Sequence, residues 1–309
     1  MIAAALDLGS NTLRLLVAEV SGGDWRALDR GLTSPRLGRG LKPGGKLSQA
    51  SKNAALKTAA DFVGRARELG ALRVALAATQ ACRQAADGEQ FVAELGRELG
   101  LDSARVISGD EEAALSRRGV LSRLKGGEAS AQGAWLADIG GGSTEIMDLG
   151  QPKAEVLSLD LGAVNLTEAH ITSDPPGADQ LEALQAAVEK GLGPVIKGWQ
   201  DRQCSRLIAT AGTAATLAAL RLGMQVYQPE EINNLEVSRG DLIMEFKRLA
   251  ALPLAQRQRE LALEPQRADI IIAGLAILKG LVQGLGLQNF ITMDAGLLEG
   301  ILLEHAALA

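Results

Sequence analysis

The chain has 309 residues, of which 47% are hydrophobic, 22% are charged and only 3% are aromatic. This composition is typical of a soluble globular protein, and the length favours two domains over one. The net charge of −5 at pH 7 gives no indication of nucleic acid binding, and two cysteines with two histidines exclude a disulfide framework and a histidine-rich metal centre.

The first half of the chain reads as three strands followed by alternating helices and strands. Strands are expected at 2–8, 12–20, about 24–30, 72–78 and 104–107, and helices at about 49–69, 87–99 and 109–124. The first two strands are joined by the hairpin-like turn Gly9-Ser10-Asn11. The small, polar segment 126–133 then marks the expected domain boundary.

After this boundary the pattern restarts. WLADIGGGSTEIMDL at 135–149 repeats the layout of ALDLGSNTLRLLV, with Asp138 corresponding to Asp7. Further expected elements are a strand at 154–160, a helix at about 177–198, a strand-turn-helix at 206–220, and helices near 238–251, 265–285 and 295–307. We therefore expect two related α/β domains, 1–125 and 126–309, that face each other across a cleft. In an alternative division of the domains, the C-terminal helix at 297–309 packs back on the first domain.

Two features bear on location. The N-terminal strand reaches Asp7 without a basic leader or a cleavage signature. The apolar run at 269–287 is interrupted by Lys279, Gln283 and four glycines, which favours a buried core helix over a membrane span. We expect a cytoplasmic protein with no membrane partner and no nucleic acid partner.

Each half carries a glycine-rich turn after a strand that ends in an aspartate. Glycines allow close approach of the backbone, and exposed N–H groups favour an anion, so DLGSNT (7–12) and DIGGGST (138–144) are candidate halves of a phosphate clamp. A third turn, in ATAGTAATLAAL at 209–220, opens a helix. The alternatives are ordinary hairpin turns and, for Thr213, a plain N-cap. The expected phosphate-binding residues are Gly9, Ser10, Asn11, Gly140, Gly141, Gly142, Ser143, Thr144, Gly212 and Thr213.

Three acidic residues are candidates for metal binding and acid–base chemistry. Asp138 and Glu145 offer the carboxylate oxygens that Mg²⁺ prefers. In ISGDEEA (107–113), Ser108 and Glu111 form a capping box, which leaves Glu112 unexplained. Glu112 is either a helix-dipole residue or the group that activates the attacking water.

The segment from Arg30 to Ala60 contains seven basic residues and no acid. A solvated loop and an anion-binding surface are equally good interpretations at this point.

The motifs together resemble the exopolyphosphatase / guanosine pentaphosphate phosphohydrolase family, within the actin, sugar kinase and heat-shock chaperone ATPase superfamily. The matching segments are DLGSNT (7–12), RLGRGL (36–41), TQACRQA (79–85), ISGDEEA (107–113), DIGGGSTE (138–145), LGAVNLTE (161–168), ATAGTAATLA (209–218), RADIIIAGLAIL (267–278) and DAGLLEG (294–300). The resemblance implies two ribonuclease-H-like domains and a Mg²⁺-dependent hydrolase that removes terminal phosphate from a phosphoanhydride chain.

The same resemblance assigns roles to individual residues. It places Glu112 at the catalytic glutamate and Arg83 at an arginine that reaches toward phosphate, while Asp138 and Glu145 fall on the metal loop. It also gives weight to a polyphosphate path formed by Arg36, Arg39 and Lys42, because the first two lie in RLGRGL.

At two motif positions where the family has arginine, this chain has Asn165 and Leu298. The leading hypothesis is an exopolyphosphatase, and the alternative substrate is guanosine pentaphosphate, whose guanine pocket is not identifiable from sequence. A kinase of the superfamily is disfavoured by the motif around Glu112. A non-catalytic sensor of polyphosphate or an alarmone stays open because of Asn165 and Leu298, and the apolar C-terminal helix could serve a homodimer interface.

Overall fold

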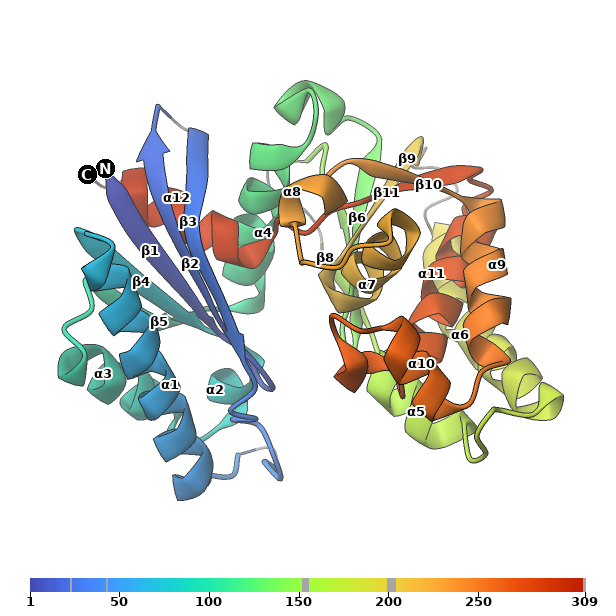
Figure 1. The fold of residues 1–309 in the computed structure, drawn as a ribbon, viewed down its shortest axis with the longest axis horizontal. Coiled ribbons are helices and arrows are strands. Elements are labelled where there is room, and N and C mark those ends of the chain that lie inside the picture. The colour runs from blue at the N-terminus through green and yellow to red at the C-terminus, as the bar shows by residue number, and fades with distance from the viewer. Residues whose placement is uncertain (23, 43, 152–155, 199–203, 308–309) are drawn as a thin grey trace. The chain divides into compact units, whose positions relative to one another are not determined.

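The computed structural model describes residues 1–22, 24–42, 44–151, 156–198 and 204–307 (Figure 1). The chain forms two compact units: Met1–Ser122 with Ala295–Ala309, and Arg123–Asp294. It therefore passes from one unit to the other twice, after Ser122 and after Asp294.

The first unit is built on a five-stranded sheet with the order β3-β2-β1-β4-β5. Its strands are β1 (Ile2–Leu8), β2 (Leu13–Ser21), β3 (Asp24–Thr33), β4 (Arg73–Ala78) and β5 (Ser103–Val106). Tight turns make β1, β2 and β3 antiparallel, whereas helical crossovers make β1, β4 and β5 parallel. The strands predicted for this half are confirmed.

Helices cover both faces of this sheet. They are α1 (Gln49–Glu68), α2 (Gln80–Gln84), α3 (Gly88–Glu98), α4 (Gly109–Arg123) and α12 (Leu297–Ala307). Side chains alternate along β1, so Leu6 and Leu8 join the core under α1 and α3, while Ala3 and Ala5 join the core under α12. Leu298 is 4% exposed within this second core, which gives it a packing role.

Helices α4 and α12 meet at unusually short range. A Cβ added to Gly119 would lie 1.8 Å from the Gly296 carbonyl oxygen, and one added to Gly300 would lie 1.9 Å from that of Leu115. Only glycine fits such contacts, so these two residues set the approach of α12 to the helix that begins near Glu112.

The second unit is built on a six-stranded sheet with the order β10-β11-β9-β6-β7-β8. Its strands are β6 (Ala134–Ile139), β7 (Thr144–Asp148), β8 (Val156–Leu159), β9 (Arg206–Thr210), β10 (Leu235–Ser238) and β11 (Asn289–Thr292). Read as β8-β7-β6-β9-β11, the order reproduces that of the first unit, with β10 as an additional antiparallel strand. The first residues of the strand expected at 154–160 lie outside the described residues.

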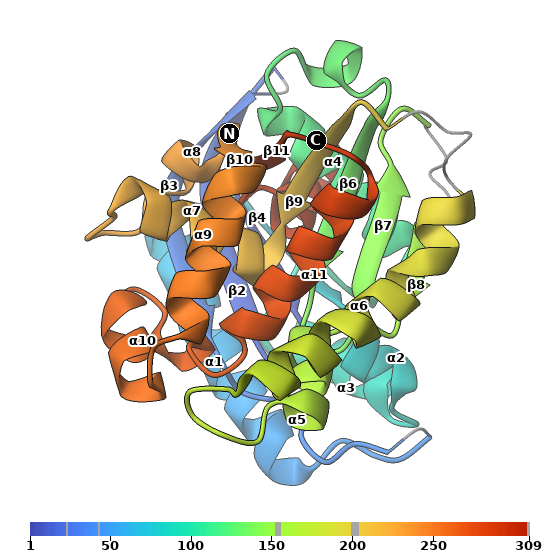
Figure 2. The same ribbon diagram turned by 90° about the vertical axis from the view of Figure 1, so that its right-hand side faces the viewer.

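The helical elements of the second unit surround an apolar core (Figure 2). They are η1 (Gly127–Ser130), α5 (Ala163–His170), α6 (Ala178–Gly198), α7 (Ala211–Leu222), α8 (Pro229–Ile232), α9 (Arg239–Ala250), α10 (Leu254–Glu260), η2 (Pro265–Arg267) and α11 (Ile271–Gly284). The helix expected at 265–285 is wrong at its start: Pro265–Arg267 forms a separate 3-10 turn, and α11 begins only at Ile271.

Helix α11 is apolar on nearly all sides and is packed within the unit. Its one charged side chain, Lys279, is buried, where its Nζ donates to Gln185 at 2.8 Å and lies 4.5 Å from the centre of the Phe246 ring. Burial lowers the pKa of Lys279. Within the described ranges, no helix combines the length and the apolar composition that a membrane crossing requires.

Candidate functional site

The two glycine turns are closed by the same hydrogen bond. In the first unit, the Gly9 N–H donates to the Thr12 carbonyl oxygen at 2.9 Å. In the second, the Gly140 N–H donates to the Ser143 carbonyl oxygen at 3.0 Å. The internal repeat predicted from the sequence therefore extends to the turn geometry.

In the first turn, the carbonyl groups are bonded by a neighbouring loop. Gly38 N–H donates to the Ser10 carbonyl at 2.8 Å, and Arg36 N–H donates to that of Asn11 at 3.0 Å. Arg36 adopts a left-handed conformation, with φ of 53°, to make this contact. The N–H groups of Ser10 and Asn11 have no acceptor among the described residues, so they remain available to an anion.

The second turn is arranged in the same way by the start of α5. Ala163 and Val164 donate their N–H groups to the carbonyl oxygens of Gly140 and Gly141, at 3.0 and 2.8 Å. Asn165 Nδ2 donates to the Gly142 carbonyl oxygen at 3.0 Å. The N–H groups of Gly141 and Gly142 have no acceptor in the described part of the chain. Asn165, a departure from the family pattern, thus holds the turn in place.

The hydroxyl groups beside the second turn have internal partners. Thr144 is fully buried and donates to the Leu161 carbonyl oxygen at 2.5 Å. The hydroxyls of Ser143 and Ser158 donate to Glu145 Oε1 at 2.7 and 2.8 Å. These contacts fix the orientation of the Glu145 carboxylate.

Asp138 and Glu145 are direct cross-strand partners on β6 and β7. Directly opposed residues of antiparallel strands project from the same face, so the two carboxylates are neighbours. Mg²⁺ is commonly held by one or two carboxylates together with phosphate and water, and this pair fits that requirement. No cluster of three or more His, Cys, Asp or Glu suited to a metal ion occurs among the described residues.

Arg83 and Glu112 form an ion pair at the edge of the first sheet where β1, β4 and β5 end. Arg83 Nη1 lies 2.6 Å from Glu112 Oε2 and donates to the Ile107 carbonyl oxygen at 2.9 Å. The side chains are 30% and 32% exposed, so the pair is accessible to solvent. Loops after parallel strands converge at one edge, which places this pair on the same side as the first glycine turn.

Glu111, the neighbour of Glu112, has a different role. Its Oε2 accepts from the Ser108 N–H at 2.8 Å, while the Ser108 hydroxyl accepts from the Glu111 N–H at 3.1 Å. The predicted capping box is confirmed, and the bond from the Ser108 backbone lowers the pKa of Glu111.

The start of α7 lies beside the second turn, because Thr210 at the end of β9 pairs with Asp138. Ala211 is left-handed, with φ of 64°, a strained conformation of the kind that clusters at active sites and ligand clamps. The Thr213 side chain is 5% exposed and packs against Gly274, so Thr213 can offer an anion its N–H but not its hydroxyl.

Arg267 lies directly over Gly212 and was missed by the sequence analysis. A Cβ added to Gly212 would be 1.8 Å from Arg267 Nη1, and Arg267 Nε donates to Glu264 Oε1 at 2.9 Å. Neither of its terminal nitrogens has an acceptor in the described chain. The only signal in the sequence was its position at the start of the motif RADIIIAGLAIL.

The basic residues between Arg30 and Ala60 include some that form ion pairs and some that do not. Arg30 is paired with the buried Glu299 at 3.0 Å, and Lys52 with Asp87 at 2.5 Å. The three residues of the expected polyphosphate path are exposed and have no ion pair within the described ranges; they are Arg36, Arg39 and Lys42.

Two α/β units with one strand order, each with an amide-lined turn after its first strand, define the two-domain, ribonuclease-H-like class expected from the sequence. The chain belongs to the Ppx/GppA phosphatase family, whose model matches residues 16–308. The predicted family and enzyme class are therefore confirmed.

Three relatives illustrate this similarity. Exopolyphosphatase 2 of Mycobacterium tuberculosis is 32% identical over 316 residues, with 98% of each chain covered. The guanosine-5'-triphosphate,3'-diphosphate pyrophosphatase of Aeromonas hydrophila is 27% identical over 97% of this chain and 58% of its own length. The crystal structure of the Aquifex aeolicus Ppx/GppA phosphatase superposes with a TM-score of 0.84 at 28% identity, with 99% of each chain covered.

Proposed function

We propose that this protein hydrolyses the terminal phosphate of inorganic polyphosphate and releases orthophosphate. The observation that carries this proposal is a pair of turns whose carbonyl groups are bonded internally, while the N–H groups at their tips, those of Ser10, Asn11, Gly141 and Gly142, have no acceptor among the described residues. Such turns favour a phosphate over a cation. The similarity to exopolyphosphatase 2 over nearly the whole of both chains supports the same substrate.

In the proposed mechanism, the turns at 9–12 and 140–143 each bind phosphate through their N–H groups. Glu112 accepts a proton from a water molecule while the oxygen of that water forms a bond to the terminal phosphorus. The bond from that phosphorus to the bridging oxygen breaks, which leaves orthophosphate and a chain one phosphate shorter. Arg83 and the turn amides stabilise the charge that develops on the phosphate oxygens.

Asp138 and Glu145 would hold the metal ion, which we propose to be Mg²⁺. When bound, it would neutralise charge on the phosphate oxygens. The cross-strand pairing of the two carboxylates and the hydroxyl contacts to Glu145 support this assignment.

The unpaired cations Arg36, Arg39 and Lys42 are proposed to guide the rest of the polyphosphate chain, because their charge is not neutralised within the described part of the protein. A cytoplasmic location and a homodimer belong to the same proposal, and cell fractionation and light scattering would test them.

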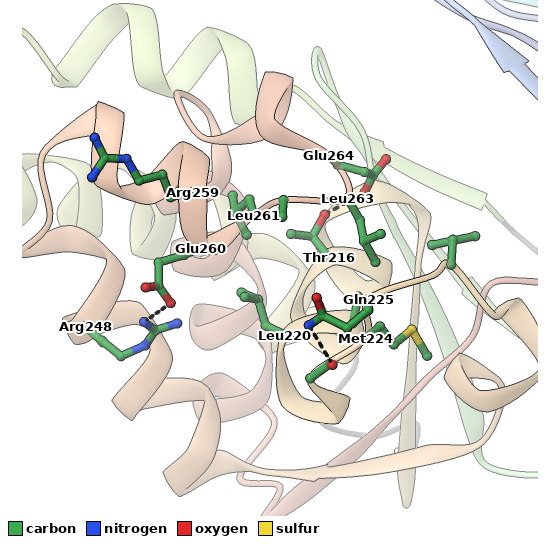
Figure 3. Close-up of a pocket in the computed structure, with 14 residues that line it drawn as sticks. Thr216, Leu220, Met224, Gln225, Arg248, Arg259, Glu260, Leu261, Leu263 and Glu264 are labelled. Carbon is green, nitrogen blue, oxygen red and sulfur yellow. Dashed lines mark hydrogen bonds and ion pairs between the residues drawn. The ribbon is translucent and has the colours of Figure 1, made fainter.

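Guanosine pentaphosphate is the second candidate substrate, supported by the Aeromonas relative. A pocket in the second unit, lined by residues of α7 and of the segment from α10 to Glu264, is the candidate position for its base (Figure 3). The sensor hypothesis loses its main support. Asn165 holds the second glycine turn and Leu298 is a core residue, so neither departure removes a group that the proposed mechanism requires.

The test is free phosphate released, with and without Mg²⁺, from tripolyphosphate, long-chain polyphosphate, guanosine pentaphosphate and ATP in parallel. We expect release from the polyphosphates that stops on chelation. Binding of polyphosphate without release from any of the four would contradict the proposal and restore the sensor hypothesis.

A further inference from the structure

The helix that carries Arg83, α2, is held in place by its surroundings. It has five residues, and isolated helices of that length are marginal in water, so its position depends on tertiary contacts. Ala81 and Cys82 are buried in the first unit. The start of α3 packs tightly against them, because a Cβ added to Gly88 would lie 2.0 Å from the Cys82 carbonyl oxygen. The contacts at the other end of α2 therefore bear directly on where Arg83 lies.

Residues 44–47 form a seam of hydrogen bonds with that end of α2. The Gly44 N–H donates to the Gln84 carbonyl oxygen at 3.1 Å, which satisfies a carbonyl of the last helical turn. The Ala86 N–H donates in return to the Gly45 carbonyl oxygen at 2.8 Å. The backbone of the basic segment is thus bonded to the helix of Arg83.

The side chain of Asp87 closes this seam. Its Oδ1 accepts from the Leu47 N–H at 3.0 Å, and its Oδ2 pairs with Lys52 Nζ of α1 at 2.5 Å. The Asp87 side chain is 13% exposed, so both contacts are largely shielded from water and are stronger than those of a surface pair. One carboxylate therefore joins residues 44–47 and α1 to the segment between α2 and α3.

The other end of the basic segment is bonded to the first glycine turn. Arg36 and Gly38 donate their N–H groups to the carbonyl oxygens of Asn11 and Ser10, and Leu37 is 1% exposed in the core. The segment is thus a brace between the turn and α2. It sets the position of Arg83 relative to the turn amides that are proposed to bind phosphate.

We propose that Asp87 is a positioning residue for Arg83. It acts through residues 44–47 and α2, without contact to the substrate. Its loss would release one end of the brace, so that Arg83 would no longer lie where the charge develops on the reacting phosphate. This inference rests on the proposed function, because it takes Arg83 as the group that stabilises that charge.

The test compares kcat and KM for tripolyphosphate in Asp87→Ala, Asp87→Asn and the wild type. Asp87→Ala removes both contacts, so kcat should fall about 100-fold, the cost of a misplacement of about 1 Å, with little change in KM. Asp87→Asn keeps an oxygen for the Leu47 N–H and should recover most of kcat. Both variants remove the same charge and release Lys52 equally, so the difference between them reports the bond to Leu47.

Two further variants separate positioning from stability. Asp29→Ala is the matched control, because it removes a carboxylate that pairs with Arg65 of the same helix, α1, at 2.6 Å and ties that helix to β3. Its kinetics should stay those of the wild type. Ala86→Pro breaks the seam at a different bond, and proline is tolerated after Ala85, which is extended. Ala86→Pro should lower kcat as Asp87→Ala does.

Hydrogen exchange of the Gly44, Leu47 and Ala86 N–H groups gives a readout that does not depend on activity. Exchange should be faster in Asp87→Ala and unchanged in Asp29→Ala.

Wild-type kcat in both Asp87→Ala and Ala86→Pro would overturn the proposal, as would equal losses in Asp87→Ala and Asp29→Ala. A loss that Asp87→Asn does not recover would show that the bond to Leu47 does not position Arg83, and would also overturn it. Failure of the proposed function looks different: the wild type would release no phosphate, while the selective change in hydrogen exchange would persist.

Discussion

Replacement of Glu112 by glutamine, with Glu111→Gln as the matched control, separates catalysis from helix capping. The two substitutions remove the same charge from adjacent residues of α4. Glutamine at 112 keeps the size of the side chain and an oxygen that can accept from Arg83, so the local geometry is retained. What it loses is the ability to take a proton from water.

The size of the expected loss of rate follows from the contribution of a general base. A positioned general base contributes about 10²–10⁴-fold to a rate, which corresponds to about 3–5 kcal/mol of barrier. Glu111→Gln keeps an oxygen for the Ser108 N–H and loses mainly the partly exposed pair with Arg105, worth about 0–1 kcal/mol of stability. Glu112→Gln should thus reduce the rate steeply with little effect on stability, and Glu111→Gln should leave the rate near that of the wild type.

The assay is phosphate release at saturating polyphosphate, with urea unfolding of each variant to monitor folding. If the two variants lose activity equally, the effect belongs to the charge or the cap of α4 and not to a base at Glu112. Unchanged turnover in Glu112→Gln would remove this residue from the mechanism altogether.

Two further predictions concern the surface and the core of the first unit. Combined replacement of Arg36, Arg39 and Lys42 by glutamine should raise KM for long polyphosphate more than for tripolyphosphate, because the local positive potential falls; equal effects on both would make this segment a solvated loop. Burial lowers the pKa of His305, whose Nε2 has no hydrogen-bond partner among the described residues. The unfolded chain therefore binds the proton more readily, and stability should fall as the pH drops below about 6.5. His305→Leu should flatten that decline in urea unfolding between about pH 7.5 and 5; an unchanged slope would assign the decline to other groups.

The fold was predictable wherever the sequence carries a long segment of apolar residues or a turn that contains glycine. Short apolar runs on either side of Gly9-Ser10-Asn11 identified β1 and β2, and glycine between strands identified both turns. Elements of four or five residues, such as α2, β10 and β11, are too short to show a period, and these were missed. The start of α11 was misplaced because proline is common in a first helical turn and also begins an isolated 3-10 turn, as Pro265 does here.

Individual residues of the site were predictable only where they lie in a sequence motif. Arg267 acts through its position over Gly212, which is distant in the sequence, so no local pattern could reveal it. Likewise, Asn165 kept the hypothesis of a non-catalytic sensor open, and no sequence pattern indicated that its amide donates to the Gly142 carbonyl. Thr144 was chosen for its hydroxyl group, but its side chain is buried within the unit and bonded to the Leu161 carbonyl.

The internal repeat also shows where its two copies have diverged. Asp7 pairs across the strands with Arg14, whose Nε and Nη2 donate to Asp7 Oδ2 at 2.8 and 2.6 Å, whereas Asp138 pairs with Glu145. The same backbone geometry thus carries a neutralised pair in one unit and two carboxylates in the other, so we expect only the second to hold a metal ion.

Single asparagine substitutions at the two aspartates test this asymmetry. Asp7→Asn should lower stability by about 1–3 kcal/mol, because a buried carboxylate with charged hydrogen bonds is lost, and should leave the Mg²⁺ concentration for half-maximal activity unchanged. Asp138→Asn should raise that concentration at least about ten-fold. Urea unfolding and Mg²⁺ titration of phosphate release measure the two effects. A Mg²⁺ requirement raised equally by both substitutions would mean that the first turn also holds the metal, despite the arginine beside it.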